Sequence, residues 1–272
     1  MKPRPFDYAR PDSIEEALAL LSEHGDEARV LAGGQTLIAM LNLRVVEPAI
    51  LVDITRIAEL DLIREIDGRI EVGAAVTQNR LLAWSALPRT LPLLAAALPF
   101  VGHFQTRNKG TVCGSIAHAD PASEIPLALA VLDGEVVLRS RRGTRVLAAG
   151  DFQQGMLTTA REPDELITAV RFPIVQGGVA FREVARRHGD FAIVAVAALA
   201  DGGNGIRLGV AGMAERPAVR RVPSEDALQD AIERLAWELE GYEDIHASAR
   251  MRRDLLRRIG PVVAQEAVRC AA

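Results

Sequence analysis

The sequence predicts an α+β fold built from three consecutive units. Short strands and helices alternate in the first unit, hairpin-forming strands are frequent in the second, and strands followed by helices make up the third. Strands grouped before helices are typical of α+β proteins. The 272 residues are enough for two or three small units, and a hydrophobic content of 49% suffices for a packed core.

Residues 1–57 are expected to form a small α/β unit. Ser13 and Glu16 have the spacing of a capping box, and the apolar residues that follow them predict a helix. Strands are expected at residues 29–31 and 49–53, where short apolar runs lie between turn residues. The first of these strands leads directly into a pair of glycines.

Residues 58–175 are predicted to form a second unit that is rich in hairpins. Alternation at 60–66 and 69–73 predicts two strands joined at Asp67-Gly68, a dipeptide that favours a tight hairpin turn. Further helices are expected at 77–85, where Thr77 is the cap, and at 91–97 and 125–132, and further strands at 135–140, 145–147 and 165–172.

Gly177 and Gly178 interrupt this pattern and predict a boundary near residue 175. In the third unit, strands are expected near 179–185, 192–199 and 206–210, and two or three helices follow, one of which begins at Ser224.

The composition disfavours nucleic-acid binding and gives no sign of a membrane span. The formal net charge is -4 and only 4% of residues are aromatic, which leaves little for an electrostatic or stacking surface. No apolar run reaches the roughly 18 residues that a spanning helix needs. Residues 1–5 lack the apolar core of a signal peptide, so a cytoplasmic location is expected. Two cysteines, Cys113 and Cys270, are too few for a four-cysteine iron–sulfur site within the chain.

Two segments of small residues are the strongest indication of function. The first is Ala32-Gly33-Gly34-Gln35-Thr36, and the second runs from Arg107 to Glu124 and contains Thr111, Gly114 and Ser115. Glycines let the backbone approach a ligand closely, and successive N–H groups then form a concavity that binds phosphate. Gln35 and Thr36 can add side-chain hydrogen bonds. Two such segments could hold the two halves of a pyrophosphate, although a helix cap or a tight turn is the ordinary use of paired glycines.

Neither segment has the fingerprint of a nicotinamide-binding domain. That fingerprint is G-x-G-x-x-G between a strand and a helix, with an acidic residue about 20 positions later. The phosphate-binding Walker pattern is also missing, because Lys109 precedes its glycine instead of following one.

The chain resembles the flavin-binding medium subunits of the molybdenum hydroxylases, a family that contains carbon monoxide dehydrogenase and xanthine dehydrogenase. Residues 32–36 match the family motif A-G-G-[HQNT]-[ST]. Residues 111–124 match T-[IV]-G-G-[NS] followed by [AL]-x-A-x-P-x-[SA]-[DE], except that Cys113 stands where glycine is usual. Residues 186–194 are similar to the R-R-x-x-D-[YFI]-A segment, and residues 6–17 resemble the family's first strand and helix, so that the resemblance covers essentially the whole chain.

The resemblance implies a specific division of the chain. Residues 1–57 and 58–175 would be two α/β flavin-binding subdomains of the vanillyl-alcohol-oxidase/PCMH type. Residues 176–272 would be a C-terminal domain of the carbon monoxide dehydrogenase flavoprotein type, with an antiparallel three-stranded sheet and helices.

The resemblance also implies which residues contact FAD. Glu124 would accept hydrogen bonds from the adenosine ribose, Leu166 or Ile167 would offer a backbone contact to the isoalloxazine ring, and Phe191 stands where relatives often have tyrosine. The implied cofactor-binding residues are Arg29, Val30, Leu31, Ala32, Gly33, Gly34, Gln35, Thr36, Thr111, Val112, Cys113, Gly114, Ser115, Ala119, Glu124, Leu166, Ile167, Asp190 and Phe191. No residue of the chain is assigned a catalytic or metal-binding role.

The function implied by the resemblance is electron transfer within a heteromeric complex. A large subunit would carry the molybdenum cofactor and oxidise the substrate, and a small subunit would carry two [2Fe-2S] clusters. FAD on this chain would pass the electrons to an external acceptor, in a dimer of heterotrimers. Two alternatives remain open: a self-contained FAD-dependent oxidoreductase that binds its own substrate, and a flavin-free scaffold that only assembles partners.

Several residues have an ordinary structural interpretation that competes with a functional one. Cys113 is expected to fill a small buried gap rather than act in redox chemistry. His118 is interpreted as a structural hydrogen-bonding residue and Asp120 as a turn former. Phe191 fits a core aromatic as well as a ring beside the flavin. The basic run Arg250, Arg252, Arg253, Arg257 and Arg258 is expected to form a solvated helix face or a partner surface.

Overall fold

The computed structural model describes residues 2–201 and 205–271, which form three larger sheets and one two-stranded ribbon. The strands are β1 (Asp7–Ala9), β2 (Ala28–Leu31), β3 (Ile50–Asp53), β4 (Ile63–Ile66), β5 (Arg69–Gly73), β6 (Glu135–Ser140), β7 (Gly143–Ala148), β8 (Gln153–Gly155), β9 (Thr158–Thr159), β10 (Leu166–Pro173), β11 (Gly178–Val184), β12 (Val194–Ala200), β13 (Ile206–Ala211) and β14 (Ala218–Val222). The α-helices are α1 (Ile14–His24), α2 (Leu37–Leu43), α3 (Gln78–Leu82), α4 (Leu87–Thr90), α5 (Pro92–Ala97), α6 (Phe104–Arg107), α7 (Val112–His118), α8 (Glu124–Val131), α9 (Ala149–Phe152), α10 (Leu228–Glu238) and α11 (Ala249–Ala271).

The N-terminal sheet is parallel, with the strand order β1-β3-β2. Helix α1 begins where the sequence predicts, because the Ser13 hydroxyl accepts a hydrogen bond from the Glu16 N–H at 3.2 Å. The Glu16 carboxylate accepts from the Asp12 N–H instead of the Ser13 N–H that a standard capping box uses. Helix α1 contacts this sheet and also strands β6 and β10 of the next one.

The second sheet is antiparallel, with the strand order β4-β5-β10-β6-β7. Strand β10 lies at its centre and pairs with both hairpins. The β4–β5 hairpin turns at Asp67 and Gly68, whose φ angles of 50° and 70° are those of a tight primed turn. That turn is confirmed. The Thr77 cap is confirmed too, since its hydroxyl accepts from the Arg80 N–H, but α3 ends at Leu82 instead of continuing to residue 85.

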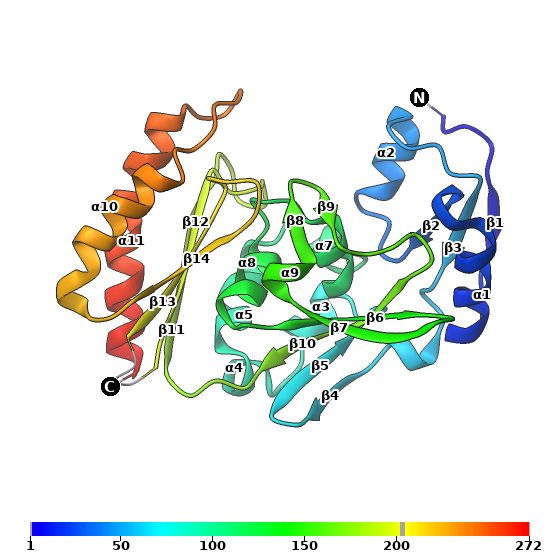
Figure 1. Cartoon of the computed structure of the whole chain (residues 1–272), viewed down its shortest axis with the longest axis horizontal. Coiled ribbons are helices and arrows are strands. Elements are labelled where there is room, and N and C mark those ends of the chain that lie inside the picture. The colour runs from blue at the N-terminus through cyan, green and yellow to red at the C-terminus, as the bar shows by residue number, and fades with distance from the viewer. Residues whose placement is uncertain (1, 202–204, 272) are drawn as a thin grey trace.

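The C-terminal sheet is antiparallel as expected and has the strand order β11-β12-β13-β14. A fourth strand, β14, therefore extends the predicted three. The sequence gives little sign of it, because an edge strand that carries the exposed Arg221 lacks the apolar alternation of a half-buried strand. Figure 1 shows α11 against one face of this sheet and the central part of the molecule against the other.

Helix α8 connects the middle unit to the C-terminal sheet. Seven of its eight residues are buried, and it contacts β12 and β13 (Figure 1). The Val131 and Leu127 side chains of α8 approach the backbone of β13 at Gly209. A β-carbon on Gly209 would lie 2.2 Å from the Val131 side chain, so the packing requires glycine there. Because Glu124 begins this helix, the C-terminal sheet fixes the direction in which Glu124 points.

Arg252 contradicts the expectation that the whole basic run forms a solvated face of α11. Its side chain is 1% exposed, and its guanidinium donates to the carbonyls of Ile193 at 2.6 Å and Gly212 at 2.8 Å. It also donates to the Tyr242 carbonyl at 3.0 Å and pairs with the Asp244 carboxylate at 2.6 Å. Five hydrogen-bond donors in a rigid fork make arginine suited to such a junction. One member of the basic run thus holds the C-terminal unit together from inside.

We expect Arg252→Met to destabilise the chain by about 3 kcal/mol, because buried carbonyls and Asp244 would lose their donor. The matched control is Arg250→Met two residues earlier on the exposed side of the helix, where the arginine side chain is 86% exposed. Urea unfolding of both variants measures the difference. Equal stability of the two variants would contradict a structural role for Arg252.

Candidate cofactor site

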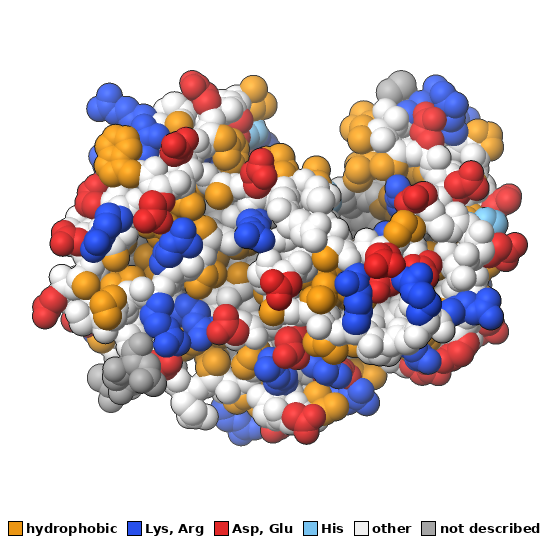
Figure 2. Space-filling model, viewed as in Figure 1, with side chains coloured by type: hydrophobic (Ala, Val, Ile, Leu, Met, Phe, Trp, Pro, Cys, Tyr) orange, Lys and Arg blue, Asp and Glu red, His pale blue; other side chains and the backbone are white. Residues whose placement is uncertain are grey.

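A cleft of about 700 Å³ lies between the N-terminal unit and the middle unit. Figure 2 shows this face hollowed between the α2 region and the β8–β9 ribbon. Most of the predicted cofactor-binding residues line it: Arg29, Val30, Ala32, Gly33, Gly34, Gln35, Thr36, Thr111, Cys113, Gly114, Ser115, Glu124, Leu166, Ile167, Asp190 and Phe191. Three do not line it: Leu31, Val112 and Ala119. The fold therefore gathers residues from positions 29 to 191 around one space.

The first glycine segment is the turn between β2 and α2. Gly34 has a φ of 68°, in the left-handed region that glycine enters without cost. Among the hydrogen bonds that the structure describes, none uses the N–H of Gly34, Gln35 or Thr36. The Gln35 amide donates to the Gly33 carbonyl at 3.0 Å, which folds that side chain back over the turn. The segment thus presents a short run of free backbone donors to the cleft.

The two glycine segments touch each other at Gly33. A β-carbon on Gly33 would lie 2.3 Å from the Lys109 carbonyl oxygen and 2.6 Å from the Gly110 α-carbon. Real β-carbons do not approach backbone atoms this closely, so a larger residue would force the segments apart. Gly33 is therefore required by the packing of the two segments, a reason that the motif by itself does not reveal.

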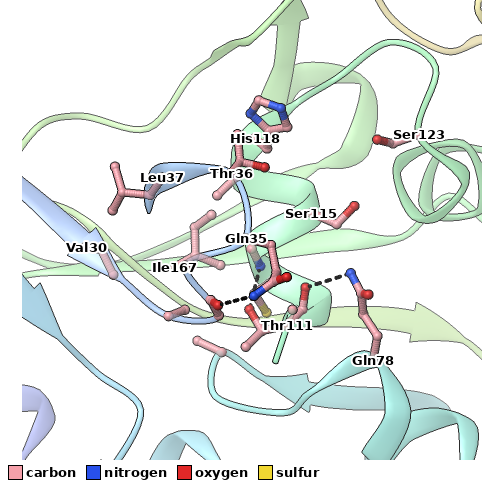
Figure 3. Close-up of a pocket in the computed structure, with 18 of the residues that line it drawn as sticks. Val30, Gln35, Thr36, Leu37, Gln78, Thr111, Ser115, His118, Ser123 and Ile167 are labelled. Atoms are coloured by element: carbon pink, nitrogen blue, oxygen red, sulfur yellow. Dashed lines mark hydrogen bonds between the residues drawn. The ribbon is translucent and has the colours of Figure 1, made fainter. Parts of the chain in front are cut away.

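The second glycine segment is partly helical, because α7 occupies Val112–His118. Thr111 caps α7, and its hydroxyl accepts from the Gly114 N–H at 2.9 Å. The Val112 N–H donates to the Val76 carbonyl at 3.1 Å, and the Ser115 N–H donates to the Thr111 carbonyl at 3.2 Å. Most backbone donors of this segment already have protein acceptors, so side chains matter more here than predicted. Figure 3 shows Ser115 and His118 of α7 beside Gln35 and Thr36 at the cleft.

Cys113 fills a buried space, as predicted. It is 3% exposed, and its sulfur lies 3.5 Å from the Val72 carbonyl oxygen. Burial raises the pKa of the Cys113 thiol far above its usual range, which leaves it protonated and unreactive. The residue that departs from the family motif therefore contributes packing rather than chemistry.

Gln78 is a site residue that the sequence analysis missed. Its N–H donates to the Gly110 carbonyl at 2.8 Å, and its side-chain amide donates to the Thr111 carbonyl at 3.4 Å (Figure 3). Its Oε1 atom is buried and has no hydrogen-bond partner in the described structure, and the residue lines the cleft. No sequence signal could have found it, because Thr77-Gln78 has the pattern of any capped helix start.

Glu124 lies at the cleft with 4% of its surface exposed. Burial, with a contribution from Asp120, raises the pKa of Glu124 to about 7. Glu183 approaches it from β11, and burial together with the Glu124 charge raises the pKa of Glu183 to about 8. The predicted ribose acceptor is thus a carboxyl group that is partly protonated near neutral pH.

The neighbours of Glu124 have different roles. Asp120 is a turn former as predicted, because its carboxylate accepts from the Ala122 N–H at 2.8 Å. His118 lines the cleft, and burial lowers its pKa, so the imidazole is neutral at neutral pH. The described hydrogen bonds include none to the His118 side chain, which gives no support to the structural role predicted for it.

The segment that carries Asp190 and Phe191 forms another edge of the cleft. Asp190 pairs with Arg186 at 3.2 Å and with Arg187 at 3.1 Å, which shapes this turn. Phe191 is 55% exposed and lines the cleft, so of the two alternatives for this residue the core aromatic is wrong. An aromatic ring held at the opening of a cleft is available to a ligand.

Comparison with known proteins identifies the family. The family described as "FAD binding domain in molybdopterin dehydrogenase" matches residues 4–175. The chain belongs to this family.

Relatives and solved structures agree with that assignment. The chain is 42% identical to caffeine dehydrogenase subunit beta of Pseudomonas sp. (strain CBB1) over 73% of this chain and 68% of the relative. It is 33% identical to glyceraldehyde dehydrogenase medium chain of Sulfolobus acidocaldarius over 94% and 96% of the two chains. Its fold matches reconstituted CO dehydrogenase from Oligotropha carboxidovorans with a TM-score of 0.94 at 31% identity, covering 100% of both chains. The protein is an FAD-binding subunit of an oxidoreductase.

The geometry of the cleft fits FAD. A volume of about 700 Å³ is within the range of roughly 300–1,000 Å³ that small-molecule and cofactor sites occupy. Free N–H groups at Gly34 to Thr36 suit a phosphate, and the unpartnered Gln78 Oε1 suits a ligand hydroxyl. Among the described residues, no three His, Cys, Asp or Glu side chains gather as metal ligands would, and no helix combines the length and apolarity needed to cross a membrane.

We expect the stability of this flavin subunit to fall as pH rises from about 4.5 to 7. The pKa of Glu124 is raised in the folded chain from its usual 4.5 to about 7, so the folded state keeps a proton that the unfolded state releases in this window. Glu124→Gln should remove this penalty and gain up to about 3 kcal/mol at pH 8.5, with little gain at pH 4.5. Urea unfolding at both pH values is the measurement, with the exposed Glu59→Gln as control. A gain of equal size at both pH values would count against the protonation argument.

Proposed function

We propose that this chain is the FAD-carrying electron-transfer subunit of a heteromeric molybdenum hydroxylase, passing electrons from [2Fe-2S] clusters of a partner subunit through FAD to an external acceptor. The observation that carries the proposal is the contact of Gly33 with Lys109 and Gly110, which brings both motif segments to one cleft. When bound, FAD supplies the redox chemistry, because it can exchange single electrons as well as electron pairs.

Different residues of the cleft would bind different parts of the cofactor. We assign the diphosphate to the backbone donors of residues 33–36 and to the hydroxyls of Thr111 and Ser115. Glu124, at the start of α8, would hold the adenosine ribose. The backbone at Leu166 and Ile167 and the ring of Phe191 would contact the isoalloxazine, and these residues line the same cleft.

Three domains would then support the cofactor: residues 1–57 and 58–175 as the two flavin-binding subdomains, and residues 176–272 as the C-terminal domain. The three larger sheets lie within these ranges, which supports the division. The C-terminal domain would supply Asp190 and Phe191 to the cleft.

The names of its relatives support a complex of several subunits. Caffeine dehydrogenase subunit beta and carbon monoxide dehydrogenase medium chain are named as parts of larger enzymes. We therefore place the substrate-oxidising molybdenum cofactor on a large partner subunit and two [2Fe-2S] clusters on a small one, in a cytoplasmic dimer of heterotrimers. Cluster ligation within this chain has no support, since Cys113 is buried and Cys270 lies at the far end of the chain.

Purification of the untagged protein from its native source tests the proposal. Flavin absorbance, together with a cluster-bearing small subunit and a large molybdenum subunit identified by mass, is the expected result. A yellow protein without partners would favour a self-contained oxidoreductase. A colourless protein that takes up no added FAD would favour a flavin-free scaffold.

We expect Gly33→Asp to abolish FAD retention. The new β-carbon would meet the Lys109 carbonyl and push the two segments apart, and the carboxylate would repel the diphosphate. Gly150→Asp is the matched control, because a β-carbon there meets nothing within 4 Å. The ratio of flavin absorbance to protein absorbance after gel filtration measures occupancy, and circular dichroism reports the fold. Full occupancy in Gly33→Asp would refute the assignment of the first segment.

A further inference from the structure

Two arginines line the cleft without a carboxylate partner. Arg29 lies on β2 of the N-terminal unit, and Arg161 lies in the segment between β9 and β10 of the middle unit. Both are half-buried, and no ion pair in the described part of the chain involves either. Burial and the nearby Arg29 charge lower the pKa of Arg161, as expected when two guanidinium groups lie close together. A strand of the N-terminal unit and a connecting segment of the middle unit thus bring two positive charges close together.

Backbone carbonyls hold both guanidinium groups in position. Nη1 of Arg29 donates to the carbonyls of Asp26 at 2.8 Å and Ala28 at 2.9 Å. Nη1 of Arg161 donates to three carbonyls of segment 162–165 at distances from 2.8 to 3.3 Å. These bonds fix the side chains but do not neutralise their charges, because a carbonyl is a dipole. The remaining N–H donors of each guanidinium group can bind a ligand.

The acids near this pair are mostly engaged elsewhere. Arg145 holds the Glu165 carboxylate with two bonds of 2.6 and 2.7 Å. Arg142 pairs with Asp164 at 2.8 Å. Asp26 lines the cleft at this end and forms no described ion pair. Arg142 also pairs with Glu162, and none of Glu162, Asp164 and Glu165 lines the cleft. Among the described residues that line this end of the cleft, Asp26 is thus one carboxylate against two guanidinium groups, which leaves the lining with a net positive charge.

The two arginines lie outside the two glycine segments in the sequence. Arg29 precedes Gly33 by four residues, which corresponds to roughly 13 Å of extended chain. Arg161 precedes Leu166 and Ile167, the residues assigned to the isoalloxazine ring, and lies in the same wall of the cleft. Arg161 lines the cleft from the segment that continues into Leu166 and Ile167, and the Arg29 charge acts on it, so the pair is assigned to the ring end of the cofactor.

We propose that Arg29 and Arg161 place positive charge beside the redox-active ring of bound FAD and thereby raise its reduction potential. The inference rests on the proposed function. Two electrons from a one-electron donor, such as an iron–sulfur cluster, and one proton from solvent add one negative charge to the oxidised ring. Attraction between that charge and the two guanidinium groups stabilises the reduced form more than the oxidised form. Arg29 and Arg161 are positioning residues in this role, since they exchange no electrons.

The midpoint potential of the FAD-loaded protein tests the inference. Reductive titration with dithionite against a reference dye is expected to give a more negative potential for Arg161→Gln and for Arg29→Gln. A tenfold weakening of reduced relative to oxidised FAD binding corresponds to about 30 mV for a two-electron couple. Arg161→Lys should change the midpoint potential of FAD only slightly, because lysine retains the positive charge. Asp26→Asn should shift it in the positive direction, because it removes the opposing charge.

Arg141→Gln is the matched control. It removes one positive charge from the turn between β6 and β7, but Arg141 is exposed, forms no ion pair that the structure describes and does not line the cleft. The midpoint potential of FAD in this control variant should equal that in the wild type. An Arg161→Gln protein that binds FAD with an unchanged potential overturns the inference and leaves the proposed function intact.

Affinity for ADP distinguishes the two ends of the cofactor. ADP has the diphosphate but no isoalloxazine ring, so Arg161→Gln should bind it as tightly as the wild type. A loss of ADP affinity in this variant would place the arginine at the diphosphate and overturn the inference. A wild-type chain that binds neither ADP nor FAD would instead overturn the proposed function.

Discussion

The contact of Gly33 with the backbone of Lys109 and Gly110 is the constraint on which the cleft depends. It joins the turn after β2 to the segment before α7, two parts of the chain that belong to different units. Backbone hydrogen bonds hold the second segment in place. The Gln78 N–H donates to the Gly110 carbonyl, and the Val112 N–H donates to the Val76 carbonyl. The floor of the cleft is therefore a backbone structure, and its shape does not depend on the rotamers of long side chains.

The C-terminal unit completes the cleft although most of it lies far from the floor. Its sheet packs on α8, which fixes Glu124, and the turn after β11 brings Phe191 to the edge of the cleft. Arg252 holds this unit together from inside through carbonyls of two separate loops. Stability of the C-terminal unit and the geometry of the cleft are thus linked, since α8 is shared by both.

Charges are distributed unevenly around the cleft. Glu124 is buried with a raised pKa near 7, so one end favours a neutral or hydrogen-bonding group. Arg29 and Arg161 add positive charge to the lining of the cleft, and Arg145 holds the Glu165 carboxylate by hydrogen bonds. An elongated ligand that carries its groups in a fixed order would bind such a cleft in one direction only.

The sequence by itself determined the family, the α+β class and a set of binding residues most of which line the cleft, because glycine motifs and capping residues act locally. Tertiary structure alone decided why Gly33 has no side chain, since its neighbour comes from position 109. It also decided that α7 begins at Val112, that Arg252 is buried, and that Phe191 is exposed. The sequence does not indicate Gln78 or Arg161 as residues of the cleft. Their roles arise where segments distant in sequence pack together, and no local pattern encodes such a contact.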